Sequence, residues 1–328
     1  MPPLRRRALL GALLASPALA AGPEAARDWP SRPVRLIVGY PAGASTDLCA
    51  RILAEDIRRR LPQPVIVENR PGANGALGAA FVAEAEPDGH TLLVSNTSTM
   101  TANHLLYRDI RYDPLRDLLP ISTITLSPFI LAVSGKSRQR ARMQSLAAIL
   151  ELARSRPEGL TYGSGGIGNL QHLNMELLAR KAGIRLLHVP FRGAAPAENA
   201  LVAGDVDLML ETPSAGPLFR DRAIDAIAVT GGTRWRDLPE VPTLAEAGLP
   251  ELVLTFWNGL VAPAGLPPAI RERLVGLMRA ASEAPETRRL LLGQGEVMVL
   301  PPEAFRDRIA ADIARNAAVI REAGIEVQ

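Results

Sequence analysis

Short apolar runs alternate along the chain with longer segments in which apolar residues recur every three or four positions. The first run, Val34–Val38, is rich in β-branched and aliphatic residues and is typical of a buried parallel strand. Residues 39–44 include two glycines and a proline, which interrupt the strand. Ser45, Thr46 and Asp47 are suited to cap a helix, and a helical spacing begins at Leu48. The pattern therefore predicts a strand, a glycine-rich loop and a helix in succession.

The same design recurs further along the chain. Apolar runs at residues 91–95, 160–162, 187–189 and 206–210 are each followed by small and polar residues, at 96–99, 163–168, 190–193 and 211–214. Parallel strands end at one edge of a sheet, so these loops are expected to line one crevice there. Free backbone N–H groups at helix starts attract anions at such an edge. For any single loop, an ordinary turn packed with small residues is the alternative.

The order of the elements predicts two α/β domains, as expected for 328 residues. Strands at 34–38, 64–67 and 91–94 and helices between them form one half of a doubly wound sheet, and a second series starts with a helix at 145–154. Extended segments at 121–133 and 252–261 are expected to cross between the domains, and a short helix is expected at 244–247. The expected boundaries are 28–126 plus 255–328 for domain 1 and 127–254 for domain 2, with the final helices returning to domain 1.

The first residues have the features of a secretory signal peptide rather than of a folded segment. Arg5, Arg6 and Arg7 form a basic region, a short apolar stretch follows, and Ala18-Leu-Ala20 fits a cleavage site. We expect residues 1–20 to be removed and the protein to be periplasmic. The paired arginines leave both ordinary secretion and a twin-arginine route open.

The amino-acid composition of the chain argues against several classes of function. The formal net charge of +3 falls to zero without the three arginines of the signal segment, so nucleic acid is not an expected partner. Aromatic residues make up 4% of the chain, which argues against a stacking platform for bases or sugars. After the signal segment there is no apolar run of bilayer length. The single cysteine, Cys49, excludes an intramolecular disulfide and is expected to be buried.

One glycine-rich motif resembles a nucleotide-binding fingerprint. Gly163-Ser-Gly-Gly-Ile-Gly168 has the spacing G-x-G-x-x-G between a predicted strand and a predicted helix. A dinucleotide site also needs an acidic residue at the end of the next strand, where this chain has His188-Val-Pro190. We therefore predict no nucleotide and no other cofactor.

Catalytic patterns are not found. Ser164 lies in Tyr162-Gly-Ser-Gly-Gly166, which departs from G-x-S-x-G. The four histidines, His90, His104, His172 and His188, have no metal-ligand spacing, and no metal is predicted. His172, in the first turn of a helix, is expected to pack or to bond locally. An exported α/β enzyme acting on small acids remains an alternative that would need a nucleophile, and an adhesion module would need repeats that the chain lacks.

Anion binding needs less than catalysis, because turn amides and helix N-termini capture a carboxylate without a charged side chain. Arg192 either neutralises an anion or is solvated. Asp47 is favoured as a residue that stabilises the helix start, with a ligand contact as the alternative. Further polar groups come from the loop residues Ser45, Thr97, Ser98, Ser164 and Asn169.

Eight segments in order resemble the Bug-type periplasmic solute-binding proteins of tripartite tricarboxylate transporters. They are RPVRLIVGYPAGASTD (32–47), QPVIVENRPGANG (63–75), EPDGHTLLVSN (86–96), YDPLRDLLPIS (112–122), LTYGSGGIGNLQHL (160–173), HVPFRG (188–193), VPTLAEAG (241–248) and FWNGLVAPAGLP (256–267). The resemblance covers the chain after the signal segment. It implies a type II periplasmic-binding-protein fold, with two domains that close around a small ligand held by backbone amides and water.

The resemblance also implies the ligand and the partners. It points to carboxylates, amino acids or related small acids, delivered to a membrane transporter or sensor by a monomeric receptor. Carried over to this chain, the ligand loops are 42–47 and 164–169, with His172 just beyond. Together with the polar groups above, the expected ligand-binding residues are Ala42, Gly43, Ala44, Ser45, Asp47, Thr97, Ser98, Ser164, Gly165, Gly166, Gly168, Asn169, His172, Phe191, Arg192 and Glu211.

Three positions depart from the family's usual pattern. Ala42-Gly43-Ala44 stands where Ala-Gly-Gly is usual, Asn169 stands where Ser or Thr is usual, and Glu211 follows a strand where no acid is expected. If Glu211 lines the crevice, an amino or amide group is its natural complement. The hypothesis is a monocarboxylate bearing a hydrogen-bond donor, such as an amino acid or a nitrogen-ring acid, ahead of a tricarboxylate. The alternative is that Glu211 caps the turn at Thr212.

Overall fold

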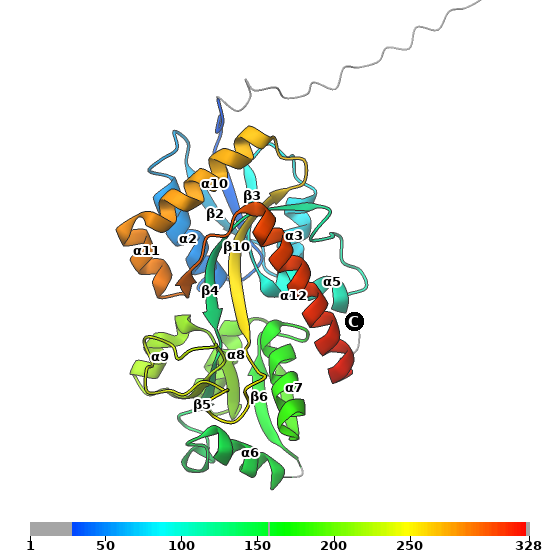
Figure 1. Cartoon of the computed structure of the whole chain (residues 1–328), viewed down its shortest axis with the longest axis vertical. Coiled ribbons are helices and arrows are strands. Elements are labelled where there is room, and N and C mark those ends of the chain that lie inside the picture. The colour runs from blue at the N-terminus through cyan, green and yellow to red at the C-terminus, as the bar shows by residue number, and fades with distance from the viewer. Residues whose placement is uncertain (1–27, 157, 326–328) are drawn as a thin grey trace, which may run out of the picture.

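The protein has two lobes, stacked along its long axis in Figure 1. The computed structural model describes residues 28–156 and 158–325. The first part of the chain forms the upper lobe, the middle forms the lower one, and the last part returns to the upper lobe before its final helix runs down beside the lower one. The expected signal peptide, residues 1–20, lies outside the described residues.

A six-stranded sheet forms the upper lobe. Strands β2, β1 and β3 run parallel, β10 runs antiparallel to β3 and β4, and β11 pairs antiparallel with the outer side of β4. The pattern agrees with the predicted parallel series, which is then extended by the two strands that approach the other lobe. In spatial order the strands are β11 (Glu296–Val297), β4 (Leu118–Pro128), β10 (Thr255–Pro263), β3 (Thr91–Asn96), β1 (Val34–Val38) and β2 (Val65–Asn69).

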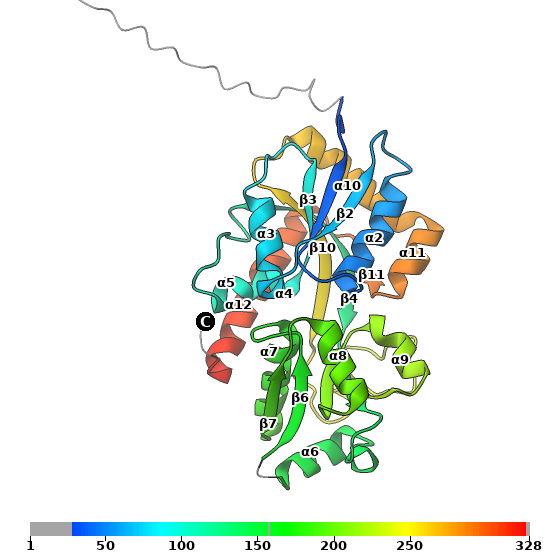
Figure 2. The same cartoon turned by 180° about the vertical axis from the view of Figure 1, so that it is seen from behind.

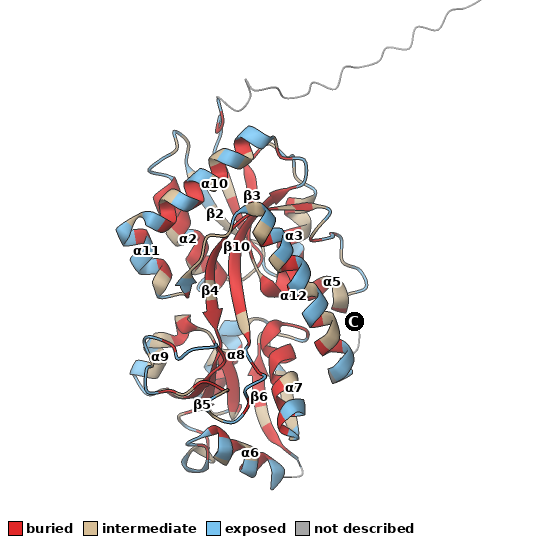
Figure 3. Cartoon of the chain, viewed as in Figure 1, coloured by how far each residue is buried: buried red, intermediate tan, exposed pale blue. Residues whose placement is uncertain are grey.

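Helices bury apolar side chains on both faces of this sheet (Figures 1 and 3). In helix α2, Cys49, Leu53 and Ile57 recur at helical spacing and are buried, as expected for Cys49. The helices packed on this face are α2 (Ser45–Ile57), α10 (Pro268–Glu283) and α11 (Pro285–Leu292). The other face is covered by α3 (Ala76–Ala83), preceded by the 3-10 helix η1 (Ala73–Gly75), and by α12 (Pro302–Ala323).

A five-stranded sheet forms the lower lobe. Strands β7, β6 and β8 run parallel, and β5 runs antiparallel to both β8 and β9. Helices lie on both faces, with α8 in front of the sheet in Figure 2. The strands in spatial order are β7 (Leu186–Pro190), β6 (Leu160–Ser164), β8 (Leu208–Glu211), β5 (Ile130–Ser134) and β9 (Ile224–Val229). The helices are α6 (Leu146–Arg154), α7 (Leu170–Ala182), α8 (Ala194–Ala203) and α9 (Gly216–Arg220), with short 3-10 turns η2 (Arg140–Arg142) and η3 (Pro213–Ala215).

The crossings between the lobes are shorter than the sequence predicts. Residues 121–133 do not form one crossing strand, because β4 ends at Pro128 and β5 starts at Ile130 in the other sheet. Phe129 sits at this break, and its N–H donates to Thr230 Oγ1 over 2.8 Å. The Thr230 hydroxyl also donates to the carbonyl of Leu254. Thr230 thus ties together both chain segments that pass between the lobes.

Helix α12 bridges the lobes in a way that the sequence does not indicate. Near its start, Phe305 and Ile309 belong to the apolar core of the upper lobe. Near its end, Val319 and Ile320 pack into the core of the lower lobe. Figure 1 shows the helix running down one side of both lobes.

Two local expectations need correction. Residues 244–247 are a series of turns rather than a helix, and the amide of Ala247 bonds to the Thr243 carbonyl over 3.0 Å. The segment after β3, expected as a loop, contains the short helices α4 (Thr97–Thr101) and α5 (Asn103–Leu106).

Within the described ranges, none of the helices is both long and apolar enough to span a bilayer.

Candidate functional site

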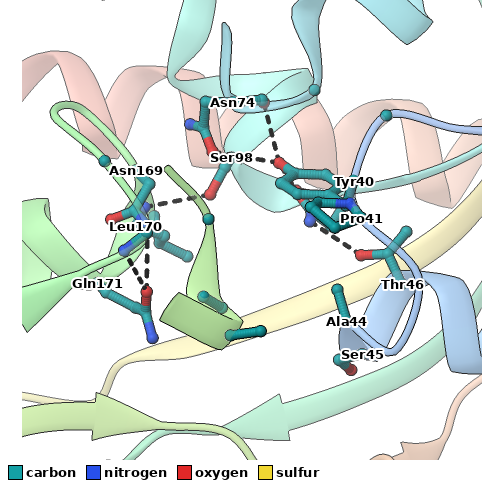
Figure 4. Close-up of a pocket in the computed structure, with 18 of the residues that line it drawn as sticks. Tyr40, Pro41, Ala44, Ser45, Thr46, Asn74, Ser98, Asn169, Leu170 and Gln171 are labelled. Atoms are coloured by element: carbon teal, nitrogen blue, oxygen red, sulfur yellow. Dashed lines mark hydrogen bonds between the residues drawn. The ribbon is translucent and has the colours of Figure 1, made fainter. Parts of the chain in front are cut away.

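A cavity of about 590 Å³ lies where the loops of the two lobes face each other (Figure 4). The upper lobe contributes the loops after β1 and β3 and residues 71–75, and the lower lobe contributes the loops after β6, β7 and β8. Phe129 and Phe256, at the crossings, complete the lining. Of the residues expected from sequence, those in the lining are Gly43, Ala44, Ser45, Thr97, Ser98, Gly165, Gly166, Asn169, Phe191, Arg192 and Glu211.

The loop after β1 brings a helix N-terminus to the cavity. Gly43 has a φ of +86°, a left-handed conformation that favours glycine, and the turn leads directly into α2. Among the described residues no side chain caps α2. Because Ala44, Ser45 and Thr46 line the cavity, the first-turn N–H groups are placed to receive an anion.

Ala42 lies outside the lining, contrary to expectation, and Asp47 also lies outside it, in agreement with its favoured role at the helix start. The Asp47 carboxylate is almost fully buried and accepts hydrogen bonds from Gly43 N–H and Arg51 Nε, both 2.9 Å, and from Asn69 Nδ2 at 2.8 Å. Burial alone raises the pKa of Asp47, but these hydrogen bonds outweigh it and hold the pKa below its ordinary value. Asp47 therefore fixes the loop from behind, and Ala42 is exposed on the outer side of the turn.

A hydrogen-bond network missed by the sequence analysis supports the upper wall. The Tyr40 hydroxyl lies 2.9 Å from the Asn74 carbonyl, 3.1 Å from Asn96 Oδ1 and 2.9 Å from Thr99 Oγ1. Burial raises the pKa of Tyr40 to about 12, so the phenol stays neutral. Asn96 Nδ2 donates to Thr46 Oγ1 over 3.0 Å, which joins this network to the start of α2.

In the lower lobe, Gln171 and Asn169 shape the glycine-rich loop (Figure 4). Gln171 Oε1 accepts from the Gly165 amide over 3.0 Å and from Asn169 Nδ2 over 3.1 Å. Asn169 caps α7, because its Oδ1 accepts from the His172 amide over 2.9 Å. Gly165 and Gly166 are thereby held at the cavity, and Gln171 was not among the expected residues.

Ser164, Gly168 and His172 lie beneath this loop and not in the cavity lining. Ser164 is fully buried, and its Oγ lies 2.6 Å from His188 Nε2. The Gly168 amide donates to His172 Nδ1 over 3.0 Å, and the His172 ring stacks on His188 with 4.0 Å between centroids. These residues set the shape of the loop from below. The Ser164–His188 contact does not provide a nucleophile to the cavity, since Ser164 has no exposed surface.

Two contacts join the lobes at the edge of the cavity. Ser98 Oγ, from the upper lobe, accepts from the Leu170 amide at the start of α7 over 3.1 Å. The Tyr107 hydroxyl donates to the Ile167 carbonyl over 3.0 Å. The first-turn amide of α7 is thus occupied by the opposite lobe rather than open to a ligand.

A second uncapped helix reaches the cavity from the lower lobe. Gly193 precedes α8 with a φ of +116°, and none of the described side chains caps this helix. Gly193, Ala194 and Ala195 line the cavity beside Phe191 and the exposed Arg192. Helices α2 and α8 therefore present open N-termini to one space from opposite lobes.

Glu211 is the charged group most deeply buried in the lining. Its side chain is 2% exposed, and its Oε1 has no hydrogen-bond partner among the described residues. The pKa of Glu211 is raised from 4.5 to about 8, mainly by burial and in addition by the charge of Glu198, although a hydrogen bond from the Thr212 amide acts in the opposite direction. Glu211 thus lines the cavity and also contacts the turn at Thr212. Glu198, which also lines the cavity, was not expected.

Comparison with known proteins gives consistent matches over most of the chain. Residues 49–325 match the family described as the Tripartite tricarboxylate transporter family receptor. Protein BugT of Bordetella pertussis is 34% identical over 327 residues, which cover 99% of each chain. Among solved structures, R. palustris Rpa4515 with adipate has a TM-score of 0.86 at 33% identity, covering 91% of this chain and 99% of that one. MatC from Rhodopseudomonas palustris with bound malate has a TM-score of 0.81 at 31% identity, covering 89% and 100%. These likenesses confirm the predicted two-domain, periplasmic-binding-protein-like α/β fold.

Proposed function

Because this chain belongs to the family of tripartite tricarboxylate transporter receptors, we propose that it captures a small carboxylate in the cavity between its lobes and delivers it to a membrane transporter or sensor. Family membership confirms the prediction of a solute-binding protein rather than an enzyme. Carboxylate ligands are also supported by the adipate and malate bound to the two similar receptors.

The observation that carries the proposal is the pair of open helix N-termini, α2 and α8, in the lining of one cavity. Each N-terminus favours an anion through its free N–H groups and its dipole, by about 0.3–1 kcal/mol at exposed positions and more when buried. We propose that the ligand contacts the expected residues that line the cavity, together with Tyr40, Thr46 and Glu198. In this proposal Asp47, Ser164 and His172 act behind the loops and do not touch the ligand.

The experiment that tests this function has two arms. Native mass spectrometry of freshly purified protein is expected to show a retained small acid. A thermal-shift screen of mono-, di- and tricarboxylates is expected to show stabilisation by about 2.7 kcal/mol for a ligand at roughly 100 times its dissociation constant. Stabilisation by neutral sugars or cations, without any acid that binds, would contradict the proposal.

Ligand binding is expected to bring the lobes together. We propose domain boundaries at 28–126 plus 255–328 and at 127–254, with the hinge at Phe129, Thr230 and Leu254, because the crossing segments meet there. The protein is expected to be a monomer. Small-angle scattering should give a smaller radius of gyration for the ligand-saturated protein than for the ligand-free protein. An unchanged radius with ligand demonstrably bound would show that the lobes are held fixed, for instance by α12.

We further propose that the protein is periplasmic and that cleavage follows Ala20, a position outside the described residues. The motive is the Ala18-Leu-Ala20 site after a basic and an apolar segment. Intact-mass measurement of protein from the periplasmic fraction should give a chain that begins at Ala21. A chain that still begins at Met1 in that fraction would contradict the assignment.

A further inference from the structure

The two carboxyl groups of the cavity both belong to the lower lobe. Glu211 ends β8, Glu198 lies on the second turn of α8, and both line the cavity. The charge of Glu198 is felt at Glu211, where it disfavours ionisation in the same direction as burial does. Burial also raises the pKa of Glu198 itself. The part of the cavity formed by Glu198 and Glu211 would therefore favour a positively charged group.

The side chains around this pair do not supply that charge. The other titratable or charged groups of the lining are Tyr40, Tyr107 and Arg192. Both tyrosines have pKa values raised by burial, so they are neutral near pH 7. Arg192 is exposed, and none of the hydrogen bonds or ion pairs of the described residues joins it to Glu211, whose Oε1 lacks a partner. A buried carboxyl oxygen without a partner is costly, and a ligand donor at this point would satisfy it.

We propose that Glu211, assisted by Glu198, binds a positively charged nitrogen of the ligand, so that the receptor selects zwitterionic monocarboxylic acids over di- and tricarboxylic acids. The inference rests on the proposed function and adds the chemical class of the ligand. The carboxylate of such a ligand lies at the open N-terminus of α2 in the upper lobe, and its cationic nitrogen lies against Glu211 in the lower lobe. A zwitterion oriented in this way links the lobes through opposite charges.

If Glu211 binds a cationic nitrogen, ligand binding should release a proton, which a glutamate with a purely structural role would not do. In the empty cavity at pH 7, Glu211 carries a proton most of the time, since its pKa is raised to about 8. A cationic nitrogen beside the carboxyl group stabilises the ionised form, so Glu211 releases its proton to the solvent when the ligand binds. Binding at pH 7 is therefore expected to release close to one proton per ligand. A dicarboxylate in the same place would keep the proton on Glu211.

The first test compares acids that share a carbon skeleton and differ in one nitrogen group. L-norvaline is paired with pentanoate, L-alanine with propanoate, and pipecolate with cyclohexanecarboxylate. In at least one pair, the member with the charged nitrogen is expected to bind about tenfold or more tightly. Equal or tighter binding of the nitrogen-free acids would overturn the inference while leaving the proposed function intact. If none of the carboxylates in this panel or in the wider screen bound, the proposed function itself would fail, and the inference with it.

The second test measures the released proton. Titration calorimetry of the preferred acid in buffers of different ionisation enthalpy gives the number of protons exchanged. Glu211→Gln is expected to abolish the release and to remove the preference within each pair, and Glu198→Gln is expected to weaken both. Glu151→Gln, on the exposed surface of α6, is the matched control and should change neither. Unchanged proton release and unchanged preference in a folded Glu211→Gln protein would overturn the inference.

Discussion

Replacing Glu211 by glutamine is expected to raise the free energy of unfolding of the ligand-free protein by about 3 kcal/mol at pH 7. The side chain is buried, its Oε1 has no partner among the described residues, and its pKa is raised from 4.5 to about 8. Keeping a proton on this group at pH 7, as the folded state requires, costs free energy relative to the unfolded chain, where the carboxyl group ionises. Glutamine has the same shape and cannot ionise, so the cost disappears.

The raised pKa of Glu211 also makes the stability of the protein depend on pH. A group with a raised pKa in the folded state favours folding below its unfolded value, and this advantage is lost as the pH rises towards the folded value. For Glu211 the loss occurs between about pH 4.5 and pH 8. Urea unfolding at several pH values should show that wild-type stability falls across this interval more steeply than that of Glu211→Gln. Parallel pH profiles for the two proteins would contradict the assigned protonation of Glu211, and Glu151→Gln should follow the wild type.

The sequence was sufficient for most of the secondary structure because local pattern and burial agree there. Val34–Val38 is a continuous apolar run and is a central strand, and Asn169 and Gly183 do bound α7 as a cap and a left-handed terminus. The helix predicted at residues 244–247 is wrong because the helical spacing there covers only one turn. Backbone hydrogen bonds to the carbonyls of Thr243 and Leu244 hold this segment as turns instead. Propensity over such a short window does not outweigh tertiary contacts.

The direction of side chains was harder to predict than the position of loops. The loops after β1 and β6 do meet at the cavity, but Asp47 and Ser164 point away from it, because each satisfies hydrogen bonds of its own loop. Tyr40 lies two residues after the end of β1, and this position in the loop could have indicated that it lines the cavity. Glu198 is one acidic residue among many on helices, and only the return of α8 beside β8 makes it part of the site.

Replacing Gly166 by leucine is expected to weaken ligand binding by about a hundredfold or more, or about 2.7 kcal/mol, while the protein still folds. Gly166 lines the cavity with a φ of +135°. A Cβ atom built there meets only the Phe191 carbonyl oxygen, at an ordinary 3.5 Å, so the protein itself leaves room for a side chain. A leucine therefore takes space that the ligand needs, and its backbone preference distorts the loop that presents the Gly165 and Gly166 amides.

Gly183→Leu separates these two effects. Gly183 ends α7 with a φ of +63° and has no atoms within 4 Å of its Cβ position, so leucine there introduces left-handed strain but lies outside the cavity lining. It should lower stability by about 1–2 kcal/mol and leave the affinity unchanged. Gly43→Leu, with a φ of +86° and equally open space, should reproduce the loss of binding from the opposite lobe. Calorimetry with the acid that gives the largest thermal shift decides the matter: a folded Gly166→Leu protein with wild-type affinity would place the ligand somewhere other than between these loops.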